Sequence, residues 1–483
     1  MPGEQPRTVA DAARALRAGA TSSVALTEAA LAEAALATAD ALGVYLARFD
    51  SEALAAARRA DRELAAGLDR GPFHGIPVGV KDVLATAEGP TTAQSLVPPD
   101  VGDVGDAGDA VAVARLRAAG AVVTGKTTTM EYGCGVPDRT KPFPVPRNPW
   151  NPDRWTGGSS SGTAAGIAAG MFLAGLGTDT AGSVRMPAAF CGVTGLVPTY
   201  GLVPRTGCVP LAYSLDRVGP LARTAHDCGL LLDVLAGPDA GDPESADVRT
   251  PPRTDHSPED LEGLRVGVVR EGHAPGDADP AVAGAFDAAV RELEELGART
   301  REVALPYLAE MITATVVIAT SEGLAHHRAG LARRWDDFGA GTRGLLAHGA
   351  LFSGADYVQA QRARRAAREA LRALFRTVDV LVSPTASLGA PPLEALTTAE
   401  GHQDNETLFA KVHTPYWNAV GLPVLALPMG FTHDGLPLSL QVAGPASGDR
   451  TVLRVGEAYQ RRTAWHLRMP RTPSRQLAEE AAR

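Results

Sequence analysis

The chain has 483 residues and a net charge of −9, with 45% hydrophobic and 21% charged residues. This composition is ordinary for a globular protein with a large core, and the acidic balance does not favour a surface that binds duplex nucleic acid. The four cysteines form no CxxC pair, which argues against a disulfide framework or a zinc ribbon. No apolar signal segment and no membrane span is apparent, so we expect a cytoplasmic protein with no membrane partner.

In chain order, the patterns predict an α/β protein in which a βαβ unit follows an N-terminal helical segment. Thr8 is expected to cap the first helix. Helices are then predicted at 23–37, 51–66, 111–119, 163–170 and 281–297, and across most of 309–376. Strands are predicted at 76–83, 121–124, 172–177, 264–269, 378–382, 423–427 and 438–442, a long functional loop at 133–158, and a surface connection at 236–262.

Lysine is rare in this chain, because only Lys81, Lys126, Lys141 and Lys411 occur among 46 cationic residues. Lys81 ends a β-branched strand, where strand alternation points it and Asp82 to opposite faces. A buried lysine has a lowered pKa and becomes a base, a role that arginine cannot fill. A structural lysine paired with a carboxylate is the equally weighted alternative.

Two small-residue segments carry serines with possible chemistry. The turn Thr180-Ala181-Gly182-Ser183 lets several backbone N–H groups point at one spot, as an oxyanion hole requires, although a plain turn explains it as well. Ser159-Ser160-Ser161 follows two glycines and precedes a helix, which Ser160 or Ser161 can cap.

Three other motifs fail their structural context. The GxGxxG at 339–344 does not follow a strand, the GxxxxGK[ST] at 120–127 has its strand inside the motif, and the GxSxG at 158–162 follows a loop. Lys126 is therefore expected to be a loop cation. The adjacent His326 and His327 point apart and are expected to be solvated, as is the arginine-rich helix face at 362–376.

Together, GIPVGVKD (75–82), GGSSSG (157–162) and DTAGSVR (179–185) resemble the amidase signature family. The two serines of this family are spaced as Ser159 and Ser183 are here, and segments such as 187–192 and 418–423 also match. The resemblance covers about residues 8–470 and is weakest from about 240 to 375. It implies the amidase signature fold, a large twisted mixed β-sheet of about eleven strands with helices on both sides.

The resemblance implies a triad in which Ser183 is the nucleophile, Ser159 the bridging serine of a cis peptide bond, and Lys81 the neutral base. The backbone amides of Thr180, Ala181, Gly182 and Ser183 would form the oxyanion hole, with Asp179 and Arg185 bracing the turn as a salt bridge. Substrate-binding candidates are Tyr132, Gly133, Cys134 and Gly135. Tyr416 and Trp417 are further candidates, with packing the favoured alternative. No metal or other cofactor is implied.

The expected activity is hydrolysis of carbon–nitrogen amide bonds in small molecules, with esters and carbamates as further substrates, through an acyl-enzyme. The expected partners are therefore a small-molecule amide and no nucleic acid, and a homodimer stays open. The alternative is the glutaminase component, the A subunit, of a tRNA-dependent amidotransferase. Such subunits usually read AFASSLDQ after the nucleophile turn, where this chain reads PLAYSLDR at 210–217.

We expect one large domain made of four segments. Residues 1–70 form a helical segment packed on the core, 71–235 the core with the triad, 236–376 a variable helical region that shapes the substrate pocket, and 377–483 the remainder of the core.

Overall fold

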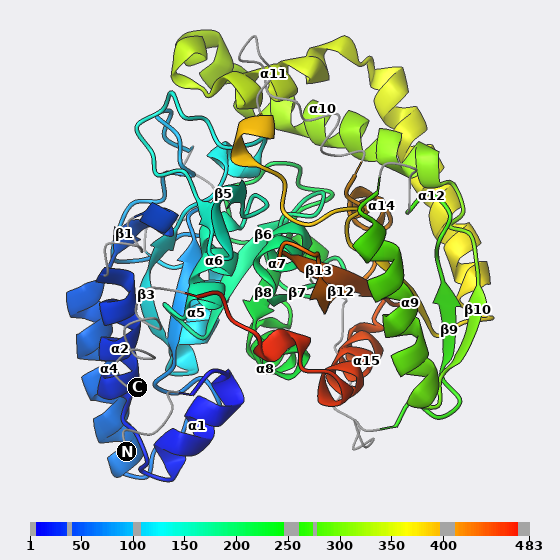
Figure 1. The fold of residues 1–483 in the computed structure, drawn as a ribbon. Coiled ribbons are helices and arrows are strands. Elements are labelled where there is room, and N and C mark those ends of the chain that lie inside the picture. The colour runs from blue at the N-terminus through cyan, green and yellow to red at the C-terminus, as the bar shows by residue number, and fades with distance from the viewer. Residues whose placement is uncertain are drawn as a thin grey trace.

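The computed structural model describes residues 6–35, 41–99, 108–245, 260–273, 278–396 and 411–471. One mixed sheet of eleven strands forms its centre, in the order β1-β3-β2-β6-β8-β7-β12-β13-β11-β9-β10 (Figure 1). The predicted large mixed sheet is confirmed. Its strands are β1 (Tyr45–Arg48), β2 (Pro77–Lys81), β3 (Val122–Thr127), β6 (Ala174–Asp179), β7 (Thr194–Val197), β8 (Arg217–Ala222), β9 (Arg265–Val268), β10 (Arg299–Glu302), β11 (Val380–Pro384), β12 (Val424–Phe431) and β13 (Pro437–Ala443); β4 (Arg147–Asn148) and β5 (Asn151–Trp155) form a separate pair.

Helices cover both faces of the sheet, and each face carries its own apolar core (Figure 1). One face packs against α5, α8, α9 and α15, and the other against α6, α7 and the group α10, α12 and α14. The helices are α1 (Val9–Arg17), α2 (Ser23–Ala35), α4 (Asp50–Ala65), α5 (Val111–Ala118), α6 (Ser161–Ala169), α7 (Arg185–Cys191), α8 (Ala225–Leu235), α9 (Pro280–Glu295), α10 (Leu308–Arg334), α11 (Ala340–His348), α12 (Gly354–Leu374), α14 (Pro415–Val420) and α15 (Asp449–Arg462).

The predicted βαβ unit is present as β2, α5 and β3, with β2 parallel to β3. On its other side β2 pairs in parallel with β6, where Val80 lies opposite Leu176. The carboxyl ends of parallel strands meet at the same edge of a sheet. This pairing therefore brings the end of β2, at Lys81, next to the end of β6, at Asp179.

Several expectations about the chain need correction. The region expected to be wholly helical before residue 70 contains the strand β1, which pairs antiparallel with β3 at the sheet edge. The loop expected at 133–158 contains the β4–β5 hairpin. Lys126 lies within β3 and is fully buried, so it is not a loop cation. Part of the predicted surface connection, residues 246–259, lies outside the described residues, as do the last two residues of the helix predicted at 23–37.

The helix α10 is a long apolar element within residues 236–376. With the turn that follows, the stretch Leu308–Asp337 is long and apolar enough to cross a bilayer by length and composition alone, and 44% of its most apolar window is buried inside the protein. Met311 and Ile318 belong to the apolar core that α10 shares with α12 and α14, and Glu322 is also buried. A core helix with one covered side accounts for this pattern.

Candidate active site

Lys81 and Ser159 meet in the interior at the shared edge of β2 and β6. Nζ of Lys81 lies 2.7 Å from Oγ of Ser159 and 2.8 Å from Oγ1 of Thr178, and a third contact reaches the Thr178 carbonyl at 3.4 Å. Lys81 is 0% exposed and Ser159 is 2% exposed. The lysine therefore faces hydroxyl and carbonyl groups, and its partner is not a carboxylate.

Burial decides the charge state of Lys81. It lowers the pKa of the ammonium to about 7, although Cys208, Asp179 and Asp216 act in the opposite direction. A substantial share of the amine is then neutral near pH 7 and has a lone pair to accept a proton. Hydrogen bonds from an adjacent hydroxyl to such an amine are the geometry that general-base catalysis needs.

The two serine segments are joined by their backbones. The peptide bond between Gly158 and Ser159 is cis, as the resemblance implied for the bridging serine. The N–H of Ser160 donates to the carbonyl of Ser183 at 3.0 Å, so the loop before α6 and the turn after β6 lie side by side. The structure thus brings Lys81, Ser159 and Ser183 into one region from three separate stretches of chain.

Ser160 and Ser161, either of which was expected to cap α6, form other hydrogen bonds. Ser160 occupies the N-cap position, but its side chain forms no cap hydrogen bond. Its Oγ instead donates to the Thr178 carbonyl and accepts from the Thr178 N–H, each at 3.2 Å. Ser161 donates to the Gly157 carbonyl at 2.7 Å. The extra serines therefore fasten the loop to β6.

The carboxylate of Asp179 stabilises the turn 180–183 that follows it. Asp179 and Arg185 form a fully buried ion pair at 3.0 Å, as predicted. Burial alone would raise the pKa of Asp179, yet the neighbouring Arg185 guanidinium holds it well below its usual range. The carboxylate also accepts the N–H of Gly182 at 2.8 Å and that of Val184 at 3.0 Å.

This arrangement corrects the expected set of oxyanion donors. The Gly182 N–H is already engaged by Asp179, so it is not free to meet an oxyanion. The N–H groups of Thr180, Ala181 and Ser183 have no acceptor in the part of the chain that the structure describes. Ala181 and Ser183 are also partly exposed, whereas Gly182 is buried. The turn thus keeps three unengaged backbone donors.

The loop expected to bind substrate lies beside Ser159. A Cβ added at Gly133 would lie 3.4 Å from Oγ of Ser159, so this glycine lies within contact distance of the serine. Tyr132 is buried, with its hydroxyl donating to the Val97 carbonyl, and Cys134 is buried in the same core. Gly133 thus lies beside the serine, whereas Tyr132 and Cys134 pack in the core.

Three further residues differ from their expected surroundings. His327 is 6% exposed, and its ring lies 4.2 Å from that of Tyr132, so it is not solvated. Arg364, on the helix face expected to be solvated, is 4% exposed and donates to the carbonyl of Ala419. Tyr416 and Trp417 are each 1% exposed and belong to the core, as the packing alternative predicted.

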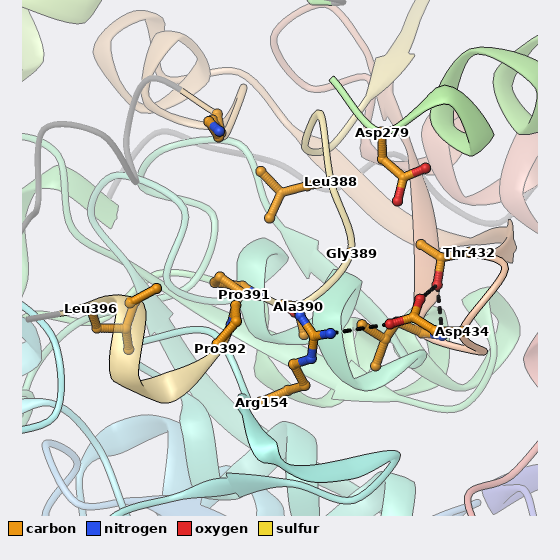
Figure 2. A pocket seen from close by; sticks show the side chains of 13 residues that line it. Arg154, Asp279, Leu388, Gly389, Ala390, Pro391, Pro392, Leu396, Thr432 and Asp434 are labelled. Carbon is orange, nitrogen blue, oxygen red and sulfur yellow. Dashed lines mark hydrogen bonds and ion pairs between the residues drawn. The ribbon is translucent and has the colours of Figure 1, made fainter. Parts of the chain in front are cut away.

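A cavity of about 390 Å³ lies apart from this cluster, between the β12–β13 hairpin and the segment 388–396 (Figure 2). Its lining includes Arg154, Asp279 and Asp434, and Figure 2 shows Arg154 reaching towards Asp434, with which it forms an ion pair at 3.2 Å. None of its 13 lining residues belongs to the set Lys81, Ser159 and Ser183. The chemistry of that set is therefore not located here. Among the described residues, no group of three or more His, Cys, Asp or Glu side chains could hold a metal ion.

The sequence analysis did not identify three residues that lie around the triad in the structure. Thr178 contacts Lys81, Thr414 contacts Ala181, and Asn418 contacts Asp179. Asn418 opens a stretch that matches the family, which was a signal of its importance, but no local pattern indicated what it contacts.

Comparison with known proteins identifies the relatives of this chain. The family model described as Amidase matches residues 25–453. The chain is 40% identical to the A subunit of glutamyl-tRNA(Gln) amidotransferase from Roseiflexus sp. (strain RS-1), over 96% of this chain and 98% of that protein. Other curated relatives carry the same name.

Two solved structures are similar to the whole molecule. An inhibitor-bound complex described in connection with the evolutionary origins of an s-triazine catabolic enzyme has a TM-score of 0.87 and 32% identity, and it covers 94% of this chain and 98% of its own. Peptide amidase from Stenotrophomonas maltophilia has a TM-score of 0.81 and 30% identity, and the match covers 96% and 98% of the two chains.

These findings overturn the expected activity on small-molecule amides and the expected lack of a nucleic-acid partner. Both expectations were wrong, because the curated relatives found over nearly the full length are subunits of an enzyme named for its tRNA. The prediction failed because the triad motifs are shared by the whole family. They do not indicate which amide a member hydrolyses or which partner it works with. The motifs, the fold and the family model agree on the wider class: this chain belongs to the amidase family.

Proposed function

We propose that this protein is the glutaminase subunit of a tRNA-dependent amidotransferase. The observation that carries the proposal is the 40% identity to the A subunit of the Roseiflexus glutamyl-tRNA(Gln) amidotransferase, which extends over 96% of this chain and 98% of that protein. In this function the chain hydrolyses the side-chain amide of glutamine. The ammonia released is used by a partner subunit that acts on tRNA-bound glutamate.

The contact between Lys81 and Ser159 supports the first step of a proton relay for this reaction. Neutral Lys81 accepts a proton from Ser159, Ser159 accepts one from Ser183, and the Ser183 oxygen attacks the amide carbon of glutamine. The negative charge that develops on the carbonyl oxygen is met by free amides of the turn 180–183. Lys81 and Ser159 return a proton to the nitrogen as the carbon–nitrogen bond breaks, which leaves ammonia and an ester on Ser183.

Water completes the cycle by the same route. It attacks the ester carbon while Ser159 and Lys81 accept its proton, and glutamate leaves as Ser183 regains its hydrogen. The burial of Lys81 supports this step, because an amine with a pKa of about 7 both accepts and returns a proton near neutral pH.

Four positions depart from the text that such subunits usually carry after the nucleophile turn, namely Pro210, Leu211, Tyr213 and Arg217, and none of them is a hydrogen-bond partner of Lys81. Tyr213 is 58% exposed. Arg217 is buried, with its guanidinium donating to the carbonyls of Pro198 and Leu422 at 3.0 and 2.7 Å. The departures at Tyr213 and Arg217 therefore add one exposed aromatic side chain and one set of internal hydrogen bonds.

The test is ammonia release from glutamine by the purified full-length chain, alone and together with Glu-tRNA(Gln) and a co-expressed partner subunit. We expect hydrolysis that rises when partner and tRNA are present, and that is lost in Ser183→Ala. The control is a short aliphatic amide under the same conditions. Rapid hydrolysis of that amide by the chain alone, with no release from glutamine in any mixture, would overturn the proposal.

A further inference from the structure

Two side chains, one just before α14 and one within it, donate to the segment 179–181, which leads into the turn that holds Ser183. Oγ1 of Thr414, just before the helix, donates to the carbonyl of Ala181 at 2.7 Å. Nδ2 of Asn418, one helical turn later, donates to the carbonyl of Asp179 at 3.1 Å and to its carboxylate at 2.8 Å. Thr414 is 0% exposed and Asn418 is 1% exposed, so water does not compete for these contacts.

Because the peptide bond is planar, these contacts fix the directions in which the neighbouring backbone N–H groups point. In a trans peptide the carbonyl of one residue and the N–H of the next point to opposite sides. Because Asn418 holds the carbonyl of Asp179, the N–H of Thr180 must point away from α14. The carbonyl of Gly182 accepts the N–H of Met186 at 2.7 Å, so the N–H of Ser183 points away from α7 in the same way.

The hydroxyl of Thr414 fixes the middle of the turn. By holding the carbonyl of Ala181 it directs the N–H of Gly182 to the opposite side, where Asp179 accepts it at 2.8 Å. The fit is close, because a Cβ at Gly182, whose φ is +133°, would overlap Oγ1 of Thr414. The turn between the two outer donors therefore has little freedom to rotate.

Arg185 supports both residues from behind. Its guanidinium donates to the backbone carbonyl of Thr414 at 3.0 Å and to the side-chain oxygen of Asn418. It also pairs with Asp179, so the strand end, the turn and the start of α14 form one hydrogen-bonded unit. The four side chains that build this unit, those of Asp179, Arg185, Thr414 and Asn418, are all buried.

We propose that Thr414 and Asn418 are positioning residues that fix the direction of the Thr180 and Ser183 amides towards the developing oxyanion. The inference rests on Ser183 acting as the nucleophile of the proposed function, and it does not depend on glutamine as the substrate. Neither residue touches the substrate. Their effect is exerted through the backbone, since an oxyanion donor works only where its N–H lies about 2.7–3.1 Å from the charged oxygen.

The matched pair Thr414→Ser and Thr414→Ala tests this proposal, because the two variants differ only by the hydroxyl. The primary readout is the rate at which a fluorophosphonate labels Ser183 in the full-length chain, a reaction that also builds negative charge at the turn. We expect Thr414→Ala to label at least about tenfold more slowly, which is less than the about 10²–10³-fold loss on removing an oxyanion donor, because the donors stay present and only their direction changes. Thr414→Ser should stay within about threefold of the unmodified protein on the same argument.

A second measurement, the pH–rate profile, distinguishes a positioning role of Thr414 from a general loss of structure in the variant. Thr414 does not contact Lys81, so the midpoint of the pH–rate profile should stay where it is while the plateau rate falls. A shift of that midpoint, or labelling of a folded Thr414→Ala at the unmodified rate, would overturn the proposal. Should Thr414→Ala fail to fold, Thr414→Val supplies the same comparison with the volume retained.

The same experiment distinguishes this inference from the proposed function. If Ser183 is labelled and the Thr414 pair behaves as expected, but glutamine is never hydrolysed, then the glutaminase function fails and the positioning role stands. If Ser183 of the unmodified protein is not labelled at all, the nucleophile is wrong and the positioning role falls with it.

Discussion

Lys126 and Asp82 form an ion pair at 3.1 Å in which both side chains are 1% exposed. Nζ of Lys126 also donates to the carbonyl of Leu84 at 2.7 Å and to Oγ1 of Thr91 at 2.8 Å. A compact ammonium with three donors suits these three acceptors, whereas the planar fork of arginine does not. This contact explains why lysine is kept here in a chain that otherwise prefers arginine. It also anchors the residue next to Lys81.

Removing Lys126 should therefore destabilise the fold strongly. We expect Lys126→Met to lower the free energy of unfolding by about 3–5 kcal/mol, because Asp82 is left buried without its counter-charge. The double variant Asp82→Asn with Lys126→Met should recover part of that loss, since no charge then remains. Urea unfolding of the three proteins measures the difference. Equal stability of the single and double variants would show that the charge of Asp82 is not what makes the loss.

The role of Lys81 as a base gives a prediction for rate against pH. The amine must be neutral to accept the proton, so activity should rise as pH increases through about 7 and then level off, following the lowered pKa of Lys81. Lys81→Arg should lose as much activity as Lys81→Ala, because the guanidinium keeps its proton throughout this range. Steady-state rates from pH 5 to 9 provide the measurement, and a flat profile would exclude this assignment.

The same lowered pKa predicts that Lys81 costs stability at neutral pH. The unfolded lysine takes up its proton below about pH 10.4, whereas the buried folded one does so only near pH 7. As pH falls across this window the unfolded state alone gains a proton, so folding stability decreases. Lys81→Met should remove the penalty, making the variant inactive but more stable than the unmodified protein at pH 7.5.

The expected gain in stability of Lys81→Met shrinks as pH rises towards 10.4, because both states of the unmodified protein are then neutral. Denaturant unfolding at pH 7.5, 8.5 and 9.5 gives the trend. Thr178→Val is a useful companion, since it removes one hydroxyl contact of Lys81 and leaves the lysine in place. A pH-independent difference between Lys81→Met and the unmodified protein would mean that packing, rather than the proton, accounts for the change.

The sequence predicted the parts of the site that depend on local backbone geometry. Lys81 ends a strand, and Ser159 and Ser183 lie in glycine-containing turns, so each has a pattern within a few residues of itself. The engagement of the Gly182 amide by Asp179 could not be read in this way, because all four amides of the turn look alike in sequence. Only the fold shows which of them already has an acceptor.

The contacts of Thr414 and Asn418 could not be predicted, because they join α14 to a turn more than 200 residues earlier in the chain. Strand β10 was missed for a different reason. Its residues Arg299–Glu302 are polar and mostly exposed at the edge of the sheet, so no alternation of apolar residues marks them. Burial alone does not decide which strands were predicted, because β7 and β8 are wholly buried and were missed as well.

His327 gives the last prediction, which concerns acid stability. Its ring packs between Tyr132 and Phe338, and its Nε2 has no hydrogen-bond partner among the described residues. Burial lowers the pKa of His327 to about 3, with His326 adding to the effect. The unfolded histidine takes up a proton near pH 6.5, which the folded one cannot do until about pH 3. Stability should therefore fall as pH decreases through this window.

Replacing His327 with phenylalanine should remove this contribution while keeping an aromatic ring in the same space. We expect His327→Phe to match or exceed the stability of the unmodified protein at pH 7.5, and to exceed it by a margin that widens from pH 6.5 to pH 4.5. Other buried histidines, such as His413, lower the acid stability of both proteins equally, so the difference isolates His327. The exposed His433→Phe serves as the control, and its curve should run parallel to that of the unmodified protein. A parallel curve for His327→Phe as well would mean that the buried ring takes up its proton without cost.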